Sequence, residues 1–139
     1  MIGRIAFACF LSLVALRTAS AETLAELVSR EEGVEFGPCA LAPRPNVKGA
    51  DIHAVIPARF ATPGIWATRT LLLVGVDGTG TVQDQMELRL MADVPPREVL
   101  SVRCSGDRLD IRLSAHASRK VLRHRWTGQR LTPAGASRR

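Results

Sequence analysis

Aromatic side chains are scarce in this chain, which has four phenylalanines, two tryptophans and no tyrosine. Proteins that hold single-stranded nucleic acid stack the bases on aromatic rings, so this composition argues against a nucleic-acid partner. The chain also lacks any Gly-x-Ser-x-Gly or Cys-x-x-Cys sequence. Two common signatures of nucleophilic and redox catalysis are therefore missing.

No apolar run is long enough to cross a bilayer as a helix, which takes about 20 residues. The longest, residues 5–16, follows Arg4 and precedes Ala19-Ser20-Ala21. A positive end, a short apolar centre and a small-residue cleavage site are typical of a secretory signal peptide. An uncleaved anchor is the alternative, but Arg17 interrupts the run. We expect residues 1–21 to be removed, leaving a periplasmic or secreted protein without stable membrane insertion.

Cysteine is also rare, and only Cys39 and Cys104 remain after the signal peptide. Two cysteines in an exported chain favour one structural disulfide. Closing a loop of this length would stabilise the fold by about 4 kcal/mol on the chain-entropy model. Two buried free thiols, or a metal pair completed by histidine, are the alternatives.

Alternation of apolar and polar residues dominates residues 69–113 and indicates four β-strands. Met86, Leu88 and Leu90 recur at period two, and further along the chain so do two more apolar sets. Such alternation places one face of a sheet in a core and the other in water. The other two sets are Leu100, Val102 and Cys104, and Leu109, Ile111 and Leu113.

The flanking segments complete a single domain over residues 22–132. Residues 22–33 predict a short helix that starts at a Thr23–Glu26 capping box and covers an edge or end of the sheet. Residues 37–49 predict a loop, 51–56 a strand, 60–66 an irregular segment and 133–139 a flexible basic tail. The fold class is mainly β: a small antiparallel meander, closed as a barrel or stacked as a sandwich.

Several polar groups are candidates for catalytic or metal sites. Asp77-Gly78-Thr79-Gly80 predicts a hairpin turn, because the ligands of a calcium loop and the lysine of a phosphate loop are missing. Asp51 and His53 share a strand face and could form a general base, but no nucleophile accompanies them. The spacing of His53, His116 and His124 matches no zinc pattern. We therefore expect no enzyme activity, no metal and no cofactor.

The strongest remaining feature is a basic C-terminal third, with ten arginine and lysine residues after position 102 against two aspartates. On the strand that includes residues 121–126, Arg123 and Arg125 face one way while Leu122, His124 and Trp126 face the other. Guanidinium groups bind carboxylates and phosphates in bidentate fashion. An ordinary solvated arginine-rich face would give the same pattern. The predicted binding residues are Arg112, Arg123, Arg125 and Arg130.

These observations lead to a small exported binding protein whose partner is an anionic envelope component or an acidic protein. Inhibition of a cell-wall hydrolase is a variant of this hypothesis. A structural accessory subunit of an envelope complex, docking by a sheet edge or by the N-terminal helix, is the alternative.

Overall fold

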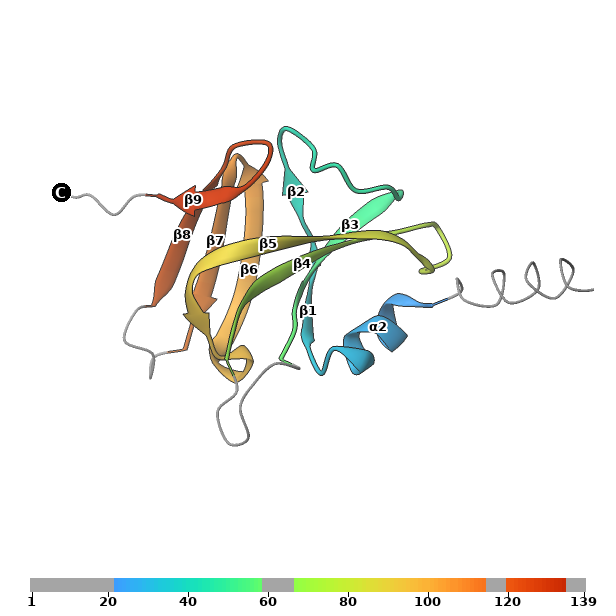
Figure 1. Ribbon diagram of the computed structural model, residues 1–139, viewed down its shortest axis with the longest axis horizontal. Helices are drawn as coiled ribbons and strands as arrows, with labels where there is room; N and C mark the ends of the chain where they lie inside the picture. Colours follow the sequence, from blue (N-terminus) through green and yellow to red (C-terminus); the bar gives the residue numbers. More distant parts are fainter. Residues whose placement is uncertain (1–21, 59–66, 115–119, 135–139) are drawn as a thin grey trace, which may run out of the picture.

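The computed structural model of the chain describes residues 22–58, 67–114 and 120–134 (Figure 1). The predicted signal peptide and the predicted irregular segment 60–66 lie outside these ranges, as does the end of the predicted tail. Pro133, the first residue of that tail, is the last residue of a strand.

Two sheets and one short helix make up the described chain. One sheet has the strand order β1-β3-β4-β5 and the other β2-β6-β7-β8-β9, and a short 3-10 helix, η1, connects them. The elements are α2 (Leu24–Arg30), β1 (Val34–Pro38), β2 (Ala40–Leu41), β3 (Asp51–Ile56), β4 (Thr68–Val76), β5 (Val82–Val94), η1 (Pro96–Glu98), β6 (Val99–Gly106), β7 (Arg108–Leu113), β8 (Val121–Trp126) and β9 (Leu131–Pro133).

The hydrophobic core lies between the two sheets and draws on both. Leu71 and Leu73 of β4 face Ile111 of β7 and Leu122 of β8, and all four are almost fully buried. Trp126 is the largest buried side chain, and its indole N–H donates to the Pro43 carbonyl at 2.6 Å. This packing confirms the predicted mainly β fold and identifies it as a sandwich.

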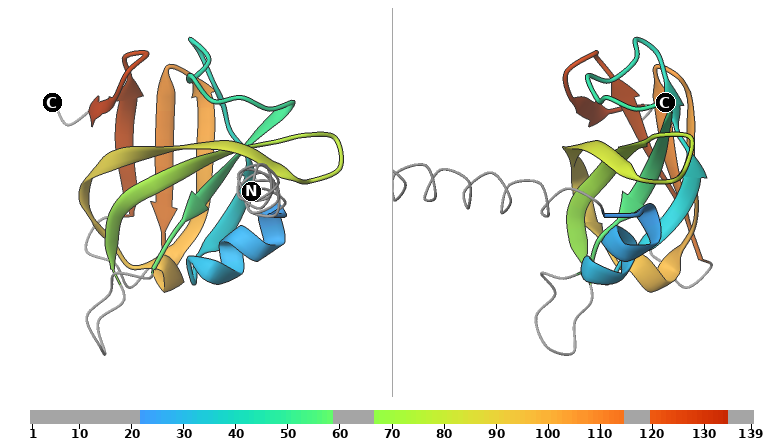
Figure 2. Two further views of the ribbon diagram at one scale, coloured as in Figure 1. Left: turned by 45° about the vertical axis from the view of Figure 1, so that its right-hand side comes forward. Right: turned by 90° about the vertical axis from the view of Figure 1, so that its right-hand side faces the viewer.

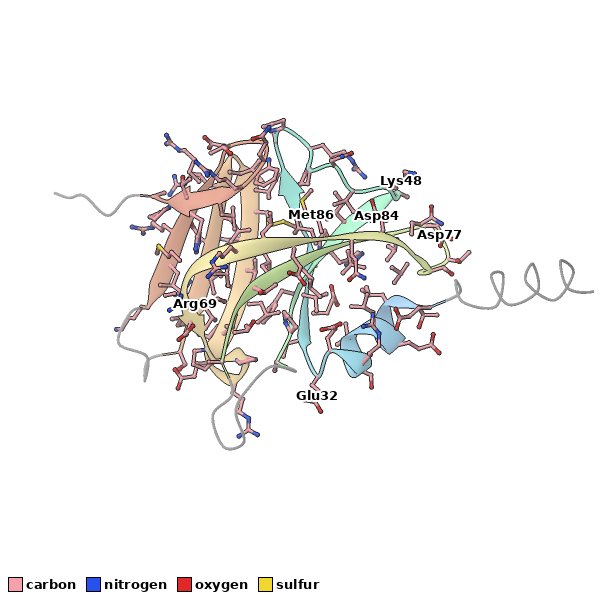
Figure 3. The ribbon with its side chains drawn as sticks, in the orientation of Figure 1. Glu32, Lys48, Arg69, Asp77, Asp84 and Met86 are labelled. Carbon is pink, nitrogen blue, oxygen red and sulfur yellow. A yellow bond between two sulfur atoms is a disulfide. The ribbon has the colours of Figure 1, made fainter. Side chains whose placement is uncertain are left out.

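Most strand pairs are antiparallel and connect neighbours in the sequence. Strands β3, β4 and β5 form one meander, and β6, β7, β8 and β9 form another. The β4–β5 connection is the hairpin predicted at residues 77–80. There the Asp77 carboxylate accepts the backbone N–H groups of Thr79 at 2.8 Å and Thr81 at 3.0 Å. The Thr79 hydroxyl and these two N–H groups lower the pKa of Asp77. Figure 3 shows Asp77 and Arg69 at opposite ends of this hairpin.

The chain changes sheets at Cys39. The strand before it, β1, pairs with β3, whereas β2 directly after it pairs in parallel with β6. The predicted disulfide between Cys39 and Cys104 is confirmed and joins this crossing point to β6, with the two Cα atoms 4.9 Å apart. The predicted loop over residues 37–49 is wrong at its start, because the chain stays extended through Leu41 to pair with partners distant in the sequence.

Helix α2 covers the outer face of the first sheet rather than its edge or end (Figure 2). Thr23 and Glu26 form the predicted capping box at its start. Leu27 is fully buried against Val55 and Leu72, with Val74 beside them. Since one face of β4 meets the main core and the other meets α2, the strand is apolar at consecutive positions.

The predicted inward face of the strand that became β6 is wrong at its first residue. Leu100 was expected to point inward with Val102, but its side chain is 61% exposed. The pairing of β6 with β7 shifts between Val99 and Ser101, so Val99 takes the inward position and Leu100 is displaced outward.

No helix in the described ranges is both long enough and apolar enough to span a membrane.

Candidate functional site

The outer face of the second sheet carries a cluster of arginines. Cross-strand pairs share a face, and the register aligns Arg103 of β6 with Asp110 of β7 and Arg123 of β8. One row along, Ser105 is followed by Arg108 and Arg125. We call this surface the basic face, defined by five exposed arginines: Arg103, Arg108, Arg112, Arg123 and Arg125.

Carboxylates offset only part of this positive charge. Asp110 stands between Arg103 and Arg123 in the register, and Asp107 lies in the β6–β7 turn. The Arg125 Nε atom is 3.5 Å from an Asp107 oxygen, and both side chains are more than half exposed. An exposed pair of this kind contributes little to stability, about 0–1 kcal/mol.

Two arginines on this face lie directly opposite each other. Arg108 of β7 is the cross-strand partner of Arg125 of β8. Like charges in this position destabilise a sheet, and a bound anion would remove the cost. An anionic group bound between Arg108 and Arg125 should therefore gain more binding free energy than one bound to a single exposed arginine.

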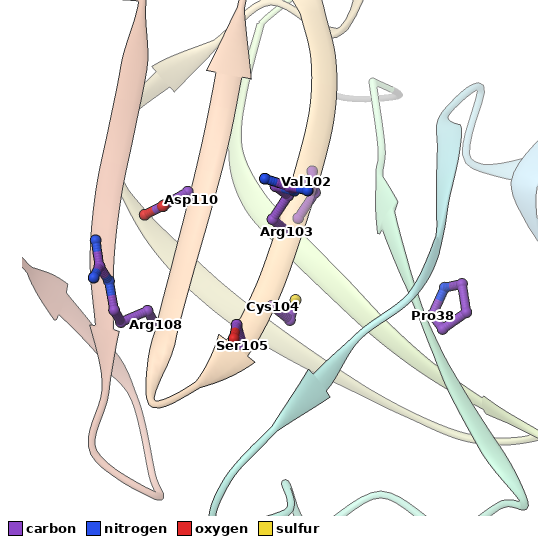
Figure 4. Close-up of a pocket in the computed structure, with 7 residues that line it drawn as sticks. All are labelled: Pro38, Val102, Arg103, Cys104, Ser105, Arg108 and Asp110. Carbon is purple, nitrogen blue, oxygen red and sulfur yellow. The ribbon is translucent and has the colours of Figure 1, made fainter.

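A hollow of about 620 Å³ adjoins the basic face at the edge of β6 (Figure 4). Arg103, Arg108 and Asp110 line it, and one Asp110 oxygen, Oδ1, is buried with no hydrogen-bond partner in the described part of the chain. A buried acceptor without a partner is costly, so a ligand that supplies an O–H or N–H donor would be favoured here. Pro38, Val102, Cys104 and Ser105 complete the lining.

The structure brings three of the four predicted binding residues together. Arg112, Arg123 and Arg125 share the basic face, whereas Arg130 follows β8 in the turn to β9 and lines a different groove with Arg69 and Arg89. The sequence reasoning left out Arg103 and Arg108. The signal that could have found them is the same alternation, because both flank inward positions at period two.

His53 and His124, two of the three candidate catalytic or metal histidines, lie in unrelated surroundings. His53, on β3, has its Nδ1 atom 3.0 Å from a Glu35 oxygen, and its partner is therefore Glu35 rather than Asp51. His124 of β8 is buried in the core, and burial lowers its pKa. His116 is outside the described residues, among which no group of three or more histidine, cysteine, aspartate or glutamate residues could hold a metal.

Comparisons with known proteins return no match: no family model, curated protein or solved structure is similar to this chain.

Proposed function

We propose that this chain is a small exported protein that binds an anionic partner through the basic face. The observation that carries the proposal is the alignment of five arginines on one sheet face, which no described element covers, with Arg108 directly opposite Arg125. Folding alone gives no reason to align like charges in this way, whereas an anionic partner does.

The contrast between the two outer sheet faces supports this choice. On the first sheet, Leu27 of α2 and its neighbours cover apolar positions of β3 and β4. On the second sheet, the outward positions of β7 and β8 are charged and exposed apart from Asp110 and Val121. The first face is closed within the described chain, while the second remains available to a partner.

Export is the second part of the proposal. The Cys39–Cys104 disulfide is a bond that persists in oxidising compartments, and residues 1–21 have the pattern of a signal peptide. In that setting the partner would be an anionic envelope component or an acidic protein. The unpartnered Asp110 oxygen favours a partner that carries hydrogen-bond donors beside its acidic groups.

A different class of function, a structural accessory subunit, is favoured by one observation. Strand β2 pairs with β6 only at Ser105 and Gly106, and within the described chain the rest of that edge has no strand partner. Leu100 is exposed on the same strand. An open edge with an apolar side chain suits strand addition by a second protein.

The test uses residues 22–139 with an intact disulfide and two immobilised probes that carry no alkyl chain, polyphosphate and polyglutamate. The test variant is Arg123→Gln/Arg125→Gln, and the control Arg89→Gln/Arg130→Gln removes the same charge elsewhere. We expect salt-sensitive binding to at least one probe, because exposed charge contacts are screened. The test variant should bind about tenfold more weakly, since it loses two exposed charge contacts of up to about 1 kcal/mol each.

Equal losses in the two double variants would show that net charge, not the basic face, determines binding, and would overturn the proposal. The accessory-subunit alternative predicts something else. One protein would be retained from envelope extract through high salt, and Leu100→Asp would release it.

A further inference from the structure

A second groove lies on the opposite border of the sandwich, where β5 leaves its own sheet. Thr70 pairs with Arg89, but Thr68 pairs with Val94, so β5 advances five residues while β4 advances two. The extra residues form a bulge, and bulges re-aim side chains next to functional sites. Figure 1 shows β5 curving from β4 toward β8 and β9.

The bulge reaches the second sheet. The Met91 backbone N–H lies 3.4 Å from the His124 Nε2 atom on β8 and donates a hydrogen bond to it. Between the bulge and β9 lies a groove of about 370 Å³ that we call the β5–β9 groove. It is lined by Arg69, Arg89, Leu90, Met91, Arg130, Leu131 and Pro133.

The floor of this groove is apolar. Leu90 is a buried core residue, and Met91 and Leu131 are partly buried against the same core. Pro133 has no backbone N–H to offer to a ligand. A small hydrated anion would gain nothing from such a floor, whereas an alkyl chain would lose apolar surface to it.

Positive charge surrounds the floor. Arg69 is neutralised by Asp93, with 2.6 Å between the Arg69 Nε atom and an Asp93 oxygen. Arg89 and Arg130 come from different sheets and have no acidic partner among the described residues. Two unneutralised guanidinium groups beside one apolar floor are complementary to an acidic headgroup joined to a chain.

We propose that the β5–β9 groove binds an anionic amphiphile: one alkyl chain on Leu90, Met91 and Leu131, with a carboxylate or phosphate headgroup held by Arg89 and Arg130. This site is separate from the basic face. The partner of the basic face need not be an amphiphile.

The test measures binding of dodecanoate and dodecyl phosphate to residues 22–139 by titration calorimetry, below the concentration at which either forms micelles. The tighter binder of the two shows whether the groove prefers a carboxylate or a phosphate headgroup. Affinity should rise at least about tenfold from hexanoate to dodecanoate, since burying methylene groups is favourable. Dodecyltrimethylammonium, which has the same chain and the opposite charge, should bind at least about tenfold more weakly than dodecanoate.

The matched variants separate the two sites. Arg89→Gln/Arg130→Gln should weaken dodecanoate binding at least about tenfold, because hydrogen bonds between a guanidinium and an acidic group are stronger than those of a neutral amide. Arg123→Gln/Arg125→Gln, with the same net charge, should change it less than about twofold, because neither arginine lines the groove and both lie at exposed outward positions of β8. Equal weakening in both variants, tight binding of the cationic amphiphile, or no dodecanoate binding would each overturn the proposal. Loss of probe binding at the basic face alone would overturn only the proposed function.

Discussion

Breaking the Cys39–Cys104 disulfide should have a large effect on stability. The two cysteines are 65 residues apart in the sequence. On the chain-entropy model, a loop of that length raises the free energy of unfolding by about 4 kcal/mol. For a domain of this size, that corresponds to a fall in Tm of about 15 °C or more on reduction. The structure adds a second reason, because the bond fixes the point where the chain passes from one sheet to the other.

Two perturbations distinguish the stability that comes from the cross-link itself from the stability that comes from packing of the two sulfur atoms. Reduction with a phosphine leaves both sulfur atoms in place, whereas Cys39→Ala/Cys104→Ala removes them. Cys39 is buried, so the double variant also leaves a small cavity and should be the less stable of the two. The reductant should have no effect on the double variant.

Urea unfolding followed by far-UV circular dichroism is the assay. Without the cross-link, the unfolded chain is less compact and exposes more surface, so the slope of free energy against urea should rise. A loss of less than about 1 kcal/mol with an unchanged slope would refute this reasoning. It would mean that the sheets hold the two cysteines together without help from the bond.

Three further predictions concern packing, pH and surface charge. Leu27→Ala should lower the free energy of unfolding by about 2–5 kcal/mol, because Leu27 is the fully buried residue of α2. The control Ser29→Ala, at an exposed position of the same helix, should change it by less than about 0.5 kcal/mol. Chemical denaturation of the two variants compares these values. His124 has a lowered pKa in the fold, so the unfolded state binds the extra proton, and stability should fall below about pH 6.5 by up to about 1.4 kcal/mol per pH unit. Thermal unfolding against pH should show that slope, and His124→Leu should lose most of it. Arg108→Gln removes a like charge opposite Arg125, so at low salt it should stabilise the unliganded protein by about 0.2–1 kcal/mol. A lower free energy of unfolding in this variant would contradict the inference that the two arginines repel each other.

Local alternation was enough to predict much of the sheet. The strand predicted at residues 51–56 is confirmed. Alternation placed Leu122, His124 and Trp126 on the strand face opposite Arg123, and all three are buried in the structure. It also placed Arg123 and Arg125 on one outward face, because residues two apart on a strand share a face whatever their partners are.

The features that sequence reasoning missed depend on partners far apart in the chain. Pairing of β2 with β6 in parallel needs residues 40–41 to meet residues 105–106, and no local pattern encodes that contact. The outward position of Leu100 follows from a register shift against β7. Arg130 was grouped with Arg125 from its position after β8, but the turn carries it to the border with β5.

The coverage of only one sheet face by α2 makes the molecule two-sided. The described chain begins next to α2 and ends at β9, on opposite sides of the sandwich (Figures 1 and 2). A surface attachment at residue 22 would therefore leave both arginine sites turned toward solution. An attachment after β9 would sit beside the β5–β9 groove and obstruct it. Any sensor or affinity matrix made from this protein should be linked through its N-terminal side.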